Sequence, residues 1–242
     1  MKNNGFDRNA APLYVQARTL ILERIEAGTY GPGKVLPSEF ALADELGISQ
    51  GTVRKALDTL VADRFLVRRQ GRGTFVADHT PADVLFRFFK FYTRDGERVL
   101  PSSRDTRVRH RIANASECAR LQLECGSRII SITRTRLHGR TPVIREKIAL
   151  PAETFPGLGA NGTVPNTLYD LFQHQYGITV THASERIEPA AASARDAAHL
   201  GLAAGSPLLR IDRLTFGLGK QPIEWRVSLC HLKGVYYLSE LR

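Results

Sequence analysis

The sequence predicts an α+β protein of two domains, and three patterns support this prediction. Apolar residues recur at helical spacing between residues 13 and 60, which is typical of amphipathic helices. Two strand-like runs then flank residues 70–73, whose two glycines favour the tip of a β-hairpin. From residue 103 onward strand-like and helix-like segments alternate, and most of the strands could form one antiparallel sheet. With 242 residues, 43% of them hydrophobic, the chain can build two cores, which excludes disorder of the whole chain.

The first predicted helix covers residues 13–27, and Gly28 followed by Pro32 marks its end. Its apolar positions are Leu13, Ala17, Leu20, Ile21 and Ile25. A second, short helix opens at Ser38, which can cap its first turn. Gly47 suits the left-handed exit from this helix.

A third helix is predicted to begin after its capping residue Ser49. Its apolar stripe consists of Val53, Ala56, Leu57 and Leu60. This stripe leaves the polar residues of the helix facing outward. Two short helices joined across residues 45–49 have the dimensions of a helix-turn-helix. The runs 65–69 and 74–76 follow as the strands of the hairpin.

The remainder of the chain is interpreted as a linker, a strand and a second domain. Residues 78–98 contain the linker and a first strand, with the aromatic residues Phe86, Phe88, Phe89, Phe91 and Tyr92. Further strands are expected at 107–109, 128–137, 142–150, 183–187, 208–216 and 223–231, and helices at 116–123, 167–176 and 191–200. The predicted domains are therefore residues 10–77 and 99–242.

Composition indicates an anionic partner and a reducing compartment. Lysine and arginine number 34 against 24 aspartate and glutamate residues, which gives a formal charge of +10. The cysteines Cys118, Cys125 and Cys230 are odd in number and lack Cys-x-x-Cys spacing, so neither a disulfide framework nor a zinc site is predicted. The sequence contains no secretory signal and no apolar run long enough to span a membrane, so a cytoplasmic protein is expected.

The third helix and the hairpin present side chains that suit DNA. A helix enters the major groove when its exposed leading turn carries donors and acceptors and is free of acids. Gln50 and Thr52 can bond base edges or phosphates, and Arg54 can address guanine or phosphate. Lys55 is placed for the DNA backbone, and the hairpin adds Arg68, Arg69, Gln70 and Arg72. The alternative is an ordinary solvated face, which is less expected for the whole array than for any single residue.

The motifs GTYGPG at residues 28–33, LPSEFALADELGISQGTVRKALDTL and RRQGRGTFV lie between residues 12 and 76. This region resembles the winged helix-turn-helix of the GntR superfamily of bacterial transcription regulators. The resemblance implies DNA contacts from Ser38, Glu39, Phe40, Gln50, Thr52, Arg54, Gln70, Gly71 and Arg72. Members commonly carry arginine where Gln50 stands and often a basic residue where Phe40 stands, so a shifted operator sequence is expected.

Basic residues are concentrated in the second domain. Residues 85–145 hold 14 basic residues against five acidic ones. Two groups share a face if their segments are strands, namely Arg107, Arg109 and Arg111, and Arg134 and Arg136. Neighbouring arginines repel one another unless solvent screens them or an anion lies between them, and the guanidinium fork suits carboxylate or phosphate. Ordinary exposure on a sheet is the more expected explanation for the first group.

Several segments carry a second resemblance: ITRTR at 132–136, the strand at 142–151, TLY at 167–169, residues 187–200 and QPIE at 221–224. They are similar to the UTRA effector domain of the HutC-type branch, over residues 85–240. That implies a chorismate-lyase-like fold binding a small metabolite between sheet and helix, through Arg134, Arg136, Glu146, Thr167, Tyr169 and Glu224. Arg226 stands where a small hydroxyl residue is common and faces with Glu224 if its strand alternates. An extra cation there favours a carboxylate-bearing effector over an amino-sugar phosphate.

Three functions are compatible with the sequence. The first is a homodimeric repressor that a small anionic metabolite releases from a pseudo-palindromic operator in double-stranded DNA, because two recognition helices supply specificity that one lacks. The second is a lyase- or hydrolase-type enzyme with a DNA-binding appendage. No motif for a nucleophile, an acid–base pair or a metal supports it, so no catalytic residue, metal or cofactor is expected. The third is an architectural DNA protein, which does not require so large a second domain.

Overall fold

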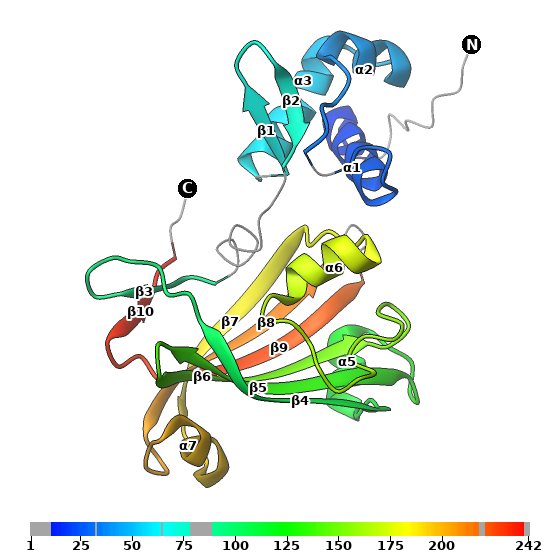
Figure 1. The fold of residues 1–242 in the computed structure, drawn as a ribbon. Coiled ribbons are helices and arrows are strands. Elements are labelled where there is room, and N and C mark those ends of the chain that lie inside the picture. Colours follow the sequence, from blue (N-terminus) through cyan, green and yellow to red (C-terminus); the bar gives the residue numbers. More distant parts are fainter. Residues whose placement is uncertain (1–10, 32, 64, 78–88, 218–220, 240–242) are drawn as a thin grey trace. The chain divides into compact units, whose positions relative to one another are not determined.

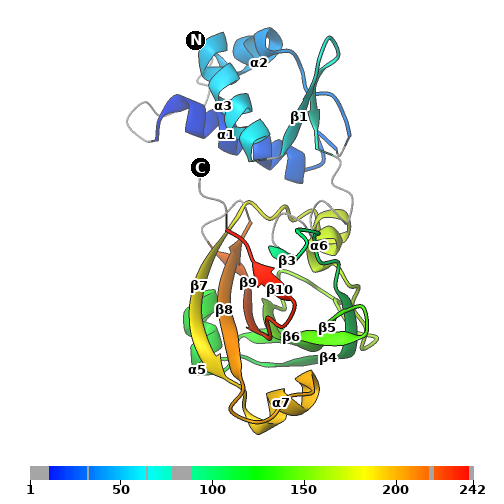
Figure 2. The same ribbon diagram turned by 90° about the vertical axis from the view of Figure 1, so that its left-hand side faces the viewer.

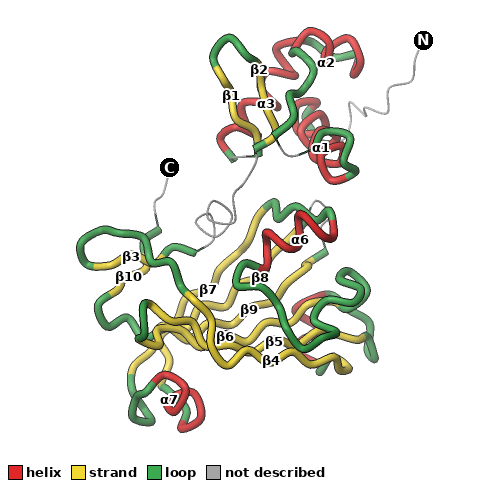
Figure 3. Tube along the Cα trace, viewed as in Figure 1, coloured by secondary structure: helices red, strands yellow, loops and turns green. Residues whose placement is uncertain are grey.

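The computed structural model describes residues 11–31, 33–63, 65–77, 89–217 and 221–239. The chain divides at residues 80 and 81 into two compact units, which Figure 1 shows in sequence colours. Residues 78–88, the first part of the predicted linker and strand at 78–98, lie outside the described residues together with Phe86 and Phe88 of the aromatic run. Figure 3 distinguishes the mainly helical first unit from the strand-rich second unit.

The first unit has the predicted helix-turn-helix and hairpin. Its elements are α1 (Leu13–Glu26), α2 (Glu39–Leu46), α3 (Gln50–Ala62), β1 (Leu66–Arg69) and β2 (Gly73–Val76). The strands pair antiparallel, from Leu66 opposite Val76 to Arg69 opposite Gly73. The stripe that the sequence indicated on α3 is buried, so its polar side chains face outward.

Local signals explain where α2 and α3 begin and end. The Ser38 hydroxyl accepts a hydrogen bond from the N–H of Ala41 at 3.1 Å. The Ser49 hydroxyl accepts one from the N–H of Thr52, also at 3.1 Å. Each of these bonds satisfies a backbone donor that a helix start leaves unpaired. Gly47 ends α2 with φ of 64°, a backbone conformation that favours glycine.

The second unit is built on an antiparallel sheet. Within residues 89–217 and 221–239 it has six strands in the order β4-β5-β6-β9-β8-β7. They are β4 (Ser102–Ile112), β5 (Arg128–His138), β6 (Thr141–Pro151), β7 (His182–Ala191), β8 (Pro207–Phe216) and β9 (Pro222–Cys230). The helices are α5 (Ala115–Leu121), α6 (Leu168–Tyr176) and α7 (Ala194–Leu200), and the short strands β3 (Phe91–Thr93) and β10 (Val235–Tyr237) pair with each other. The α+β prediction is confirmed.

Different helices cover the two faces of this sheet (Figures 1 and 2). On one face α6 packs through Tyr169 and Phe172 into the core that contains Ile132. On the other face α5 and α7 contact β6 and β9, and their cores include Trp225 and Leu229 of β9. Because side chains alternate along a strand, Glu224, Arg226 and Ser228 share one face, where Tyr169 of α6 contacts Glu224. The sequence predicted that Arg226 and Glu224 face the same way.

Strand β4 is longer than the segment 107–109 that the sequence predicted. It begins at Ser102, and its pairing with β5 shifts register between Arg104 and Arg107. Asp105 lies in this β-bulge with φ of 54°. A bulge interrupts the period of two on which strand prediction depends, so only the regular part of β4 was recognisable.

The junction between β7 and α7 also differs from the prediction. The sequence places a strand at 183–187 and a helix at 191–200, whereas β7 continues to Ala191 and α7 begins at Ala194. The Ser193 hydroxyl accepts a hydrogen bond from the N–H of Asp196 and so caps the helix. The cap decides where this helix begins, and the apolar pattern did not show it.

Candidate nucleic-acid interface and effector site

The leading turn of α3 presents the polar side chains that the sequence assigned to DNA. Gln50 and Arg54 are exposed, and Thr52 is partly buried. The Thr52 hydroxyl lies 2.8 Å from the Ser49 hydroxyl, so Thr52 also supports the cap of its own helix. This turn therefore offers an amide and a guanidinium group to a groove, with the hydroxyl held at the helix start.

Two of the predicted DNA-binding cations lie against aromatic rings. The Lys55 ammonium group lies 4.1 Å from the ring centroid of Tyr14 on α1. The Arg69 guanidinium carbon lies 4.6 Å from the ring centroid of Phe75 on β2. Both cations are exposed residues. A cation–π contact restricts the direction of a side chain without removing its charge, so both can still attract phosphate.

The tip of the hairpin is exposed and tightly turned. Gln70, Gly71 and Arg72 are all exposed, and Gly71 has φ of 69°. The N–H of Arg72 donates to the carbonyl of Arg69 at 2.9 Å and closes the turn. A groove of about 520 Å³ runs between residues 35–39 and the hairpin residues 68–74. The groove thus lies between the hairpin and the start of α2, and it is lined by Glu39 and Arg68, which contact each other.

The start of α2 contributes two side chains of opposite character. Phe40 is 74% exposed, which is unusual for a large apolar side chain. The Glu39 carboxylate accepts hydrogen bonds from Nε of Arg54 at 2.8 Å and from Nη2 of Arg68 at 3.2 Å. Residues that the resemblance assigned separately to DNA are therefore joined to one another on this surface.

Buried charges form a ladder across three strands on the α6 face of the sheet. Arg134 of β5 donates from Nε to Glu146 of β6 at 2.7 Å, and Arg226 of β9 donates to the other Glu146 oxygen at 3.3 Å. Arg226 also donates from Nη2 to Glu224 at 2.8 Å. The Tyr169 hydroxyl of α6 donates to Glu224 at 2.7 Å. All five side chains are buried. Their hydrogen bonds connect most of the predicted effector residues.

The ladder favours the charged forms of Glu146 and Arg226. Burial raises the pKa of a carboxyl group, but the neighbouring guanidinium groups lower that of Glu146 well below its usual range. Burial lowers the pKa of Arg226, but Glu224 and Glu146 raise it further. Because two carboxylates neutralise Arg226, it is not the extra unpaired cation that the sequence argument assumed.

Arg136 lies beside this ladder and has no carboxylate within ion-pairing distance in the described part of the chain. Its Nη1 donates to the Ser103 hydroxyl at 2.6 Å and to the side-chain and backbone oxygens of Asn166 at 2.7 and 3.1 Å. Its Nε is buried and has no hydrogen-bond partner among the described atoms. Arg136 is 1% exposed. Burial lowers the pKa of its guanidinium group to about 9.

Sequence reasoning missed several residues that surround Arg136. Ser103 lies opposite Arg136 on β4, and the β-bulge of that strand concealed this register. Asn166 directly precedes the predicted Thr-Leu-Tyr motif and had no signal of its own. The Phe89 ring centroid lies 5.9 Å from the Arg136 guanidinium carbon. Arg213 of β8 pairs with Glu185 of β7 at 2.5 Å, and the alternation of Arg213 with Thr215 could have suggested its position.

Other predicted residues lie outside the ladder. Thr167 is the N-cap residue of α6, but its side chain makes no capping hydrogen bond. Arg107 and Arg109 are exposed, as the sequence favoured. Arg111 pairs with Glu117 of α5 at 2.6 Å. These arginines are thus separate from the pair on β5.

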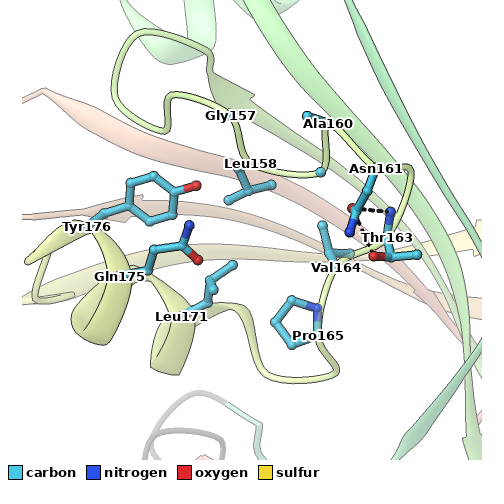
Figure 4. Close-up of a pocket in the computed structure, with 11 residues that line it drawn as sticks. Gly157, Leu158, Ala160, Asn161, Thr163, Val164, Pro165, Leu171, Gln175 and Tyr176 are labelled. Carbon is cyan, nitrogen blue, oxygen red and sulfur yellow. Dashed lines mark hydrogen bonds between the residues drawn. The ribbon is translucent and has the colours of Figure 1, made fainter.

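A second cavity lies between residues 157–165 and α6 (Figure 4). It has a volume of about 440 Å³, and its lining is uncharged, with Leu158, Leu171 and Tyr176 among its side chains. None of the predicted effector residues lines it. The carbonyl of Pro165, at its edge, lies 3.5 Å from Nη1 of Arg134. The cavity therefore lies next to the ladder, but its own lining carries no charge.

Comparison with known proteins assigns both units. Residues 13–76 match the profile of the bacterial regulatory proteins of the gntR family, and residues 97–234 match that of the UTRA domain. The chain belongs to the GntR family and carries a UTRA domain. Members of this family are DNA-binding transcription regulators, which confirms the class of function predicted from the sequence.

Individual relatives of this GntR-family chain agree with that assignment. It is 32% identical to the HTH-type transcriptional repressor NagR of Bacillus subtilis (strain 168) over 229 residues, which cover 93% of this chain and 90% of the relative. It is 29% identical to the histidine utilization repressor of Pseudomonas putida over 214 residues, 88% of this chain and 85% of the relative, in agreement with the HutC-type branch.

The solved ligand-binding domain of a GntR-family transcriptional regulator from Bordetella bronchiseptica resembles the UTRA unit. It is 28% identical, with a TM-score of 0.59, over 64% of this chain and 98% of that domain. Two features are lacking in the described residues of this chain. No helix in them is both long and apolar enough to cross a membrane. They also contain no group of three or more histidine, cysteine and acidic side chains that could hold a metal ion.

Proposed function

We propose that this GntR-family chain is a repressor that a small anionic molecule releases from its operator. The effector binds on the α6 face of the UTRA sheet, and DNA is bound by α3 and the hairpin. The protein acts in the cytoplasm as a homodimer on a pseudo-palindromic operator. The observation that carries the proposal is the buried guanidinium group of Arg136, whose Nε has no partner in the described residues.

The charge balance of the α6 face supports an anionic effector. Its described residues include four arginines and three glutamates: Arg134, Arg136, Arg213 and Arg226, and Glu146, Glu185 and Glu224. A buried charge that lacks a counter-charge is costly, and a ligand with one negative group compensates it. A carboxylate or a phosphoryl group suits the guanidinium fork. Arg136, in place of Arg226, is therefore the residue to which the anionic group binds.

Asn166 couples effector binding at Arg136 to the start of α6. Arg134 and Arg136 both donate to the Asn166 carbonyl at 3.1 Å. An anion that takes donors from Arg136 competes with Asn166, which stands immediately before the N-cap residue of α6. Effector binding is thus coupled to the start of this helix. Because binding free energies are linked reciprocally, operator binding lowers effector affinity by the same factor.

Recognition energetics support a homodimer. The leading turn of α3 offers few side chains to base edges, and each good bidentate pair discriminates by about 1–3 kcal/mol. A bacterial genome contains so many competing sites that one such turn gives too little specificity. Two copies related by a two-fold axis double the number of base contacts, and the operator then has the same symmetry.

The test is operator release measured by fluorescence anisotropy on the intergenic region beside the chain's own gene. Organic acids and sugar phosphates are each compared with a neutral counterpart, the amide or the dephosphorylated compound. The proposal predicts release by one anionic compound and none by its neutral counterpart. Arg136→Met should bind the same DNA, and the anionic compound should fail to release it. Arg136→Lys is a second variant, which keeps the positive charge but removes the guanidinium fork.

Other outcomes would contradict particular parts of the proposal. Equal release by charged and neutral compounds, or normal release of both Arg136 variants, would exclude the anion site at Arg136. Equal binding to any duplex would favour an architectural protein. If NMR shows that the protein consumes the compound that releases it from DNA, the enzyme alternative would be favoured.

A further inference from the structure

One carboxylate connects three elements of the DNA-binding unit. Glu39, the first residue of α2, accepts from Arg54 of α3 at 2.8 Å and from Arg68 of β1 at 3.2 Å. Its side chain is 22% exposed, whereas those of Arg54 and Arg68 are 56% and 43% exposed. Arg68 also pairs with Asp58 of α3 at 2.7 Å. The acid is therefore the most enclosed member of this cluster, and the arginines are presented to solvent.

Stability alone gives little reason for this arrangement. Exposed ion pairs contribute about 0–1 kcal/mol each, because solvent screens them and two long side chains lose freedom. A carboxylate on a surface that approaches phosphate also repels the partner. An acid at this position therefore weakens the attraction to DNA of any sequence. Its presence suggests a benefit of another kind, and sequence preference is one that the contacts of Glu39 can provide.

The contact atoms show what Glu39 can improve. In the described structure the contact between Glu39 and Arg54 uses Nε of the guanidinium group. With Nε occupied, the two Nη groups at the outer end of Arg54 are left for the O6 and N7 acceptors of guanine. The same carboxylate reduces the tendency of Arg54 to turn toward a phosphate. An arginine held this way reads a base and is less available to a backbone of any sequence.

We propose that Glu39 is a positioning residue that sets operator specificity by holding Arg54, and with it Arg68, before DNA arrives. This inference rests on the proposed operator recognition by α3 and the hairpin. It replaces the direct DNA contact that the sequence resemblance implied for Glu39. Its characteristic consequence is that removing the carboxylate strengthens binding to random DNA while reducing the preference for the operator.

The test compares Glu39→Gln with Asp58→Asn in the full chain. Each variant removes one negative charge and one partner of Arg68, but only Glu39→Gln removes the partner of Arg54. Anisotropy measures affinity for an operator selected from a random library and for a scrambled duplex, at several salt concentrations. We expect both variants to bind the scrambled duplex more tightly, and only Glu39→Gln to lose about tenfold in the ratio of the two affinities.

A double-mutant cycle identifies the residue through which Glu39 acts. In an Arg54→Ala background, Glu39→Gln should cause no further loss of the affinity ratio, because the positioned group is already absent. Equal ratios for Glu39→Gln and Asp58→Asn, or a full additional loss in the Arg54→Ala background, would overturn the positioning role. If the unmodified chain prefers no sequence, the proposed function fails as well, so the two failures are distinguishable.

Discussion

Among single residues, Arg136 is the one whose proposed role in effector binding conflicts with stability. Burial lowers its pKa from the usual arginine range to about 9. Because the folded-state pKa lies below the unfolded one, this group lowers stability at neutral pH. Its unfavourable contribution decreases as the pH rises above about 9 toward the usual pKa of arginine. The proposed anionic effector would relieve this cost at neutral pH by supplying the missing counter-charge.

The corresponding prediction concerns Arg136→Met in the absence of effector. The variant should be as stable as the unmodified chain or more stable by about 1 kcal/mol, since replacing a poorly compensated buried charge by an apolar group is often neutral or favourable. The control is Arg134→Met, which removes a partner of Glu146 and should cost about 3–5 kcal/mol. Urea denaturation at neutral pH measures both. A larger loss for Arg136→Met than for Arg134→Met would show that Arg136 is a structural residue.

At the same scale, the sequence predicted side-chain types better than side-chain partners. Gln50, Arg54 and the hairpin arginines could be placed on a surface because helix and hairpin signals are local. The ion pair between Arg226 and Glu146 could not be predicted, because these residues lie 80 positions apart in the chain. The contact between Glu39 and Arg54 was hidden for the same reason, with 15 positions between them.

Among the elements, α5 depends on a capping box that should respond to acid. The Asn114 side chain accepts from the Glu117 N–H, and the Glu117 carboxylate accepts from the Asn114 N–H and from Arg111. Burial raises the pKa of Glu117, but these hydrogen bonds and the Arg111 charge lower it below the usual 4.5. The stabilisation is therefore complete above pH 4.5 and is lost as the pH falls through the folded-state pKa.

Glu117→Gln tests this contribution. The variant should be less stable by about 1–2 kcal/mol near neutral pH, where it loses a charge-assisted hydrogen bond from Arg111. The difference should shrink as acid protonates Glu117 in the unmodified chain, because a protonated carboxyl resembles an amide. Denaturation curves at several pH values below 7 measure the trend. A difference that stays constant down to acidic pH would contradict it.

The turn over α6 depends on close packing at Gly159. Gly159 has φ of +69°, and a Cβ there would lie 2.6 Å from Cγ1 of Val108 on β4. Gly157, in the same turn, has φ of +77° and no atom within 4 Å of its added Cβ. Gly157→Ala should therefore cost about 1–2 kcal/mol through backbone conformation alone. Gly159→Ala should cost about 1–3 kcal/mol more through the clash. Thermal denaturation compares the two, and equal losses would show that Val108 yields without cost.

Elements with local end signals were the ones that sequence could place. The serine caps and Gly47 defined α2 and α3, and the glycine-containing tip defined the hairpin. Strand β4 was recognised only in part, because the bulge at Asp105 interrupts its alternation. The order of strands in the sheet was not predictable, because it depends on pairing between distant segments such as β6 with β9.

For the whole molecule, net charge indicated an anionic partner but not where it binds. Residues 1–78 carry 11 basic and 9 acidic residues, or +2, which leaves +8 of the total +10 for the second part of the chain. Many arginines of that second part are paired with carboxylates, among them Arg111, Arg134, Arg213 and Arg226. In the proposed function, DNA binding therefore depends on the arrangement of a few side chains on α3 and the hairpin, and net charge alone does not locate them.

The most direct test of the account is selection of DNA by the full chain from a library of random duplexes. A two-fold dimer that recognises its operator through α3 should enrich an inverted repeat whose half-site centres lie about 10 base pairs apart, or a multiple of that. A variant with Arg54→Ala and Arg72→Ala should lose this enrichment. Absence of any preferred sequence, or the same enrichment by the double variant, would contradict operator recognition by α3 and the hairpin.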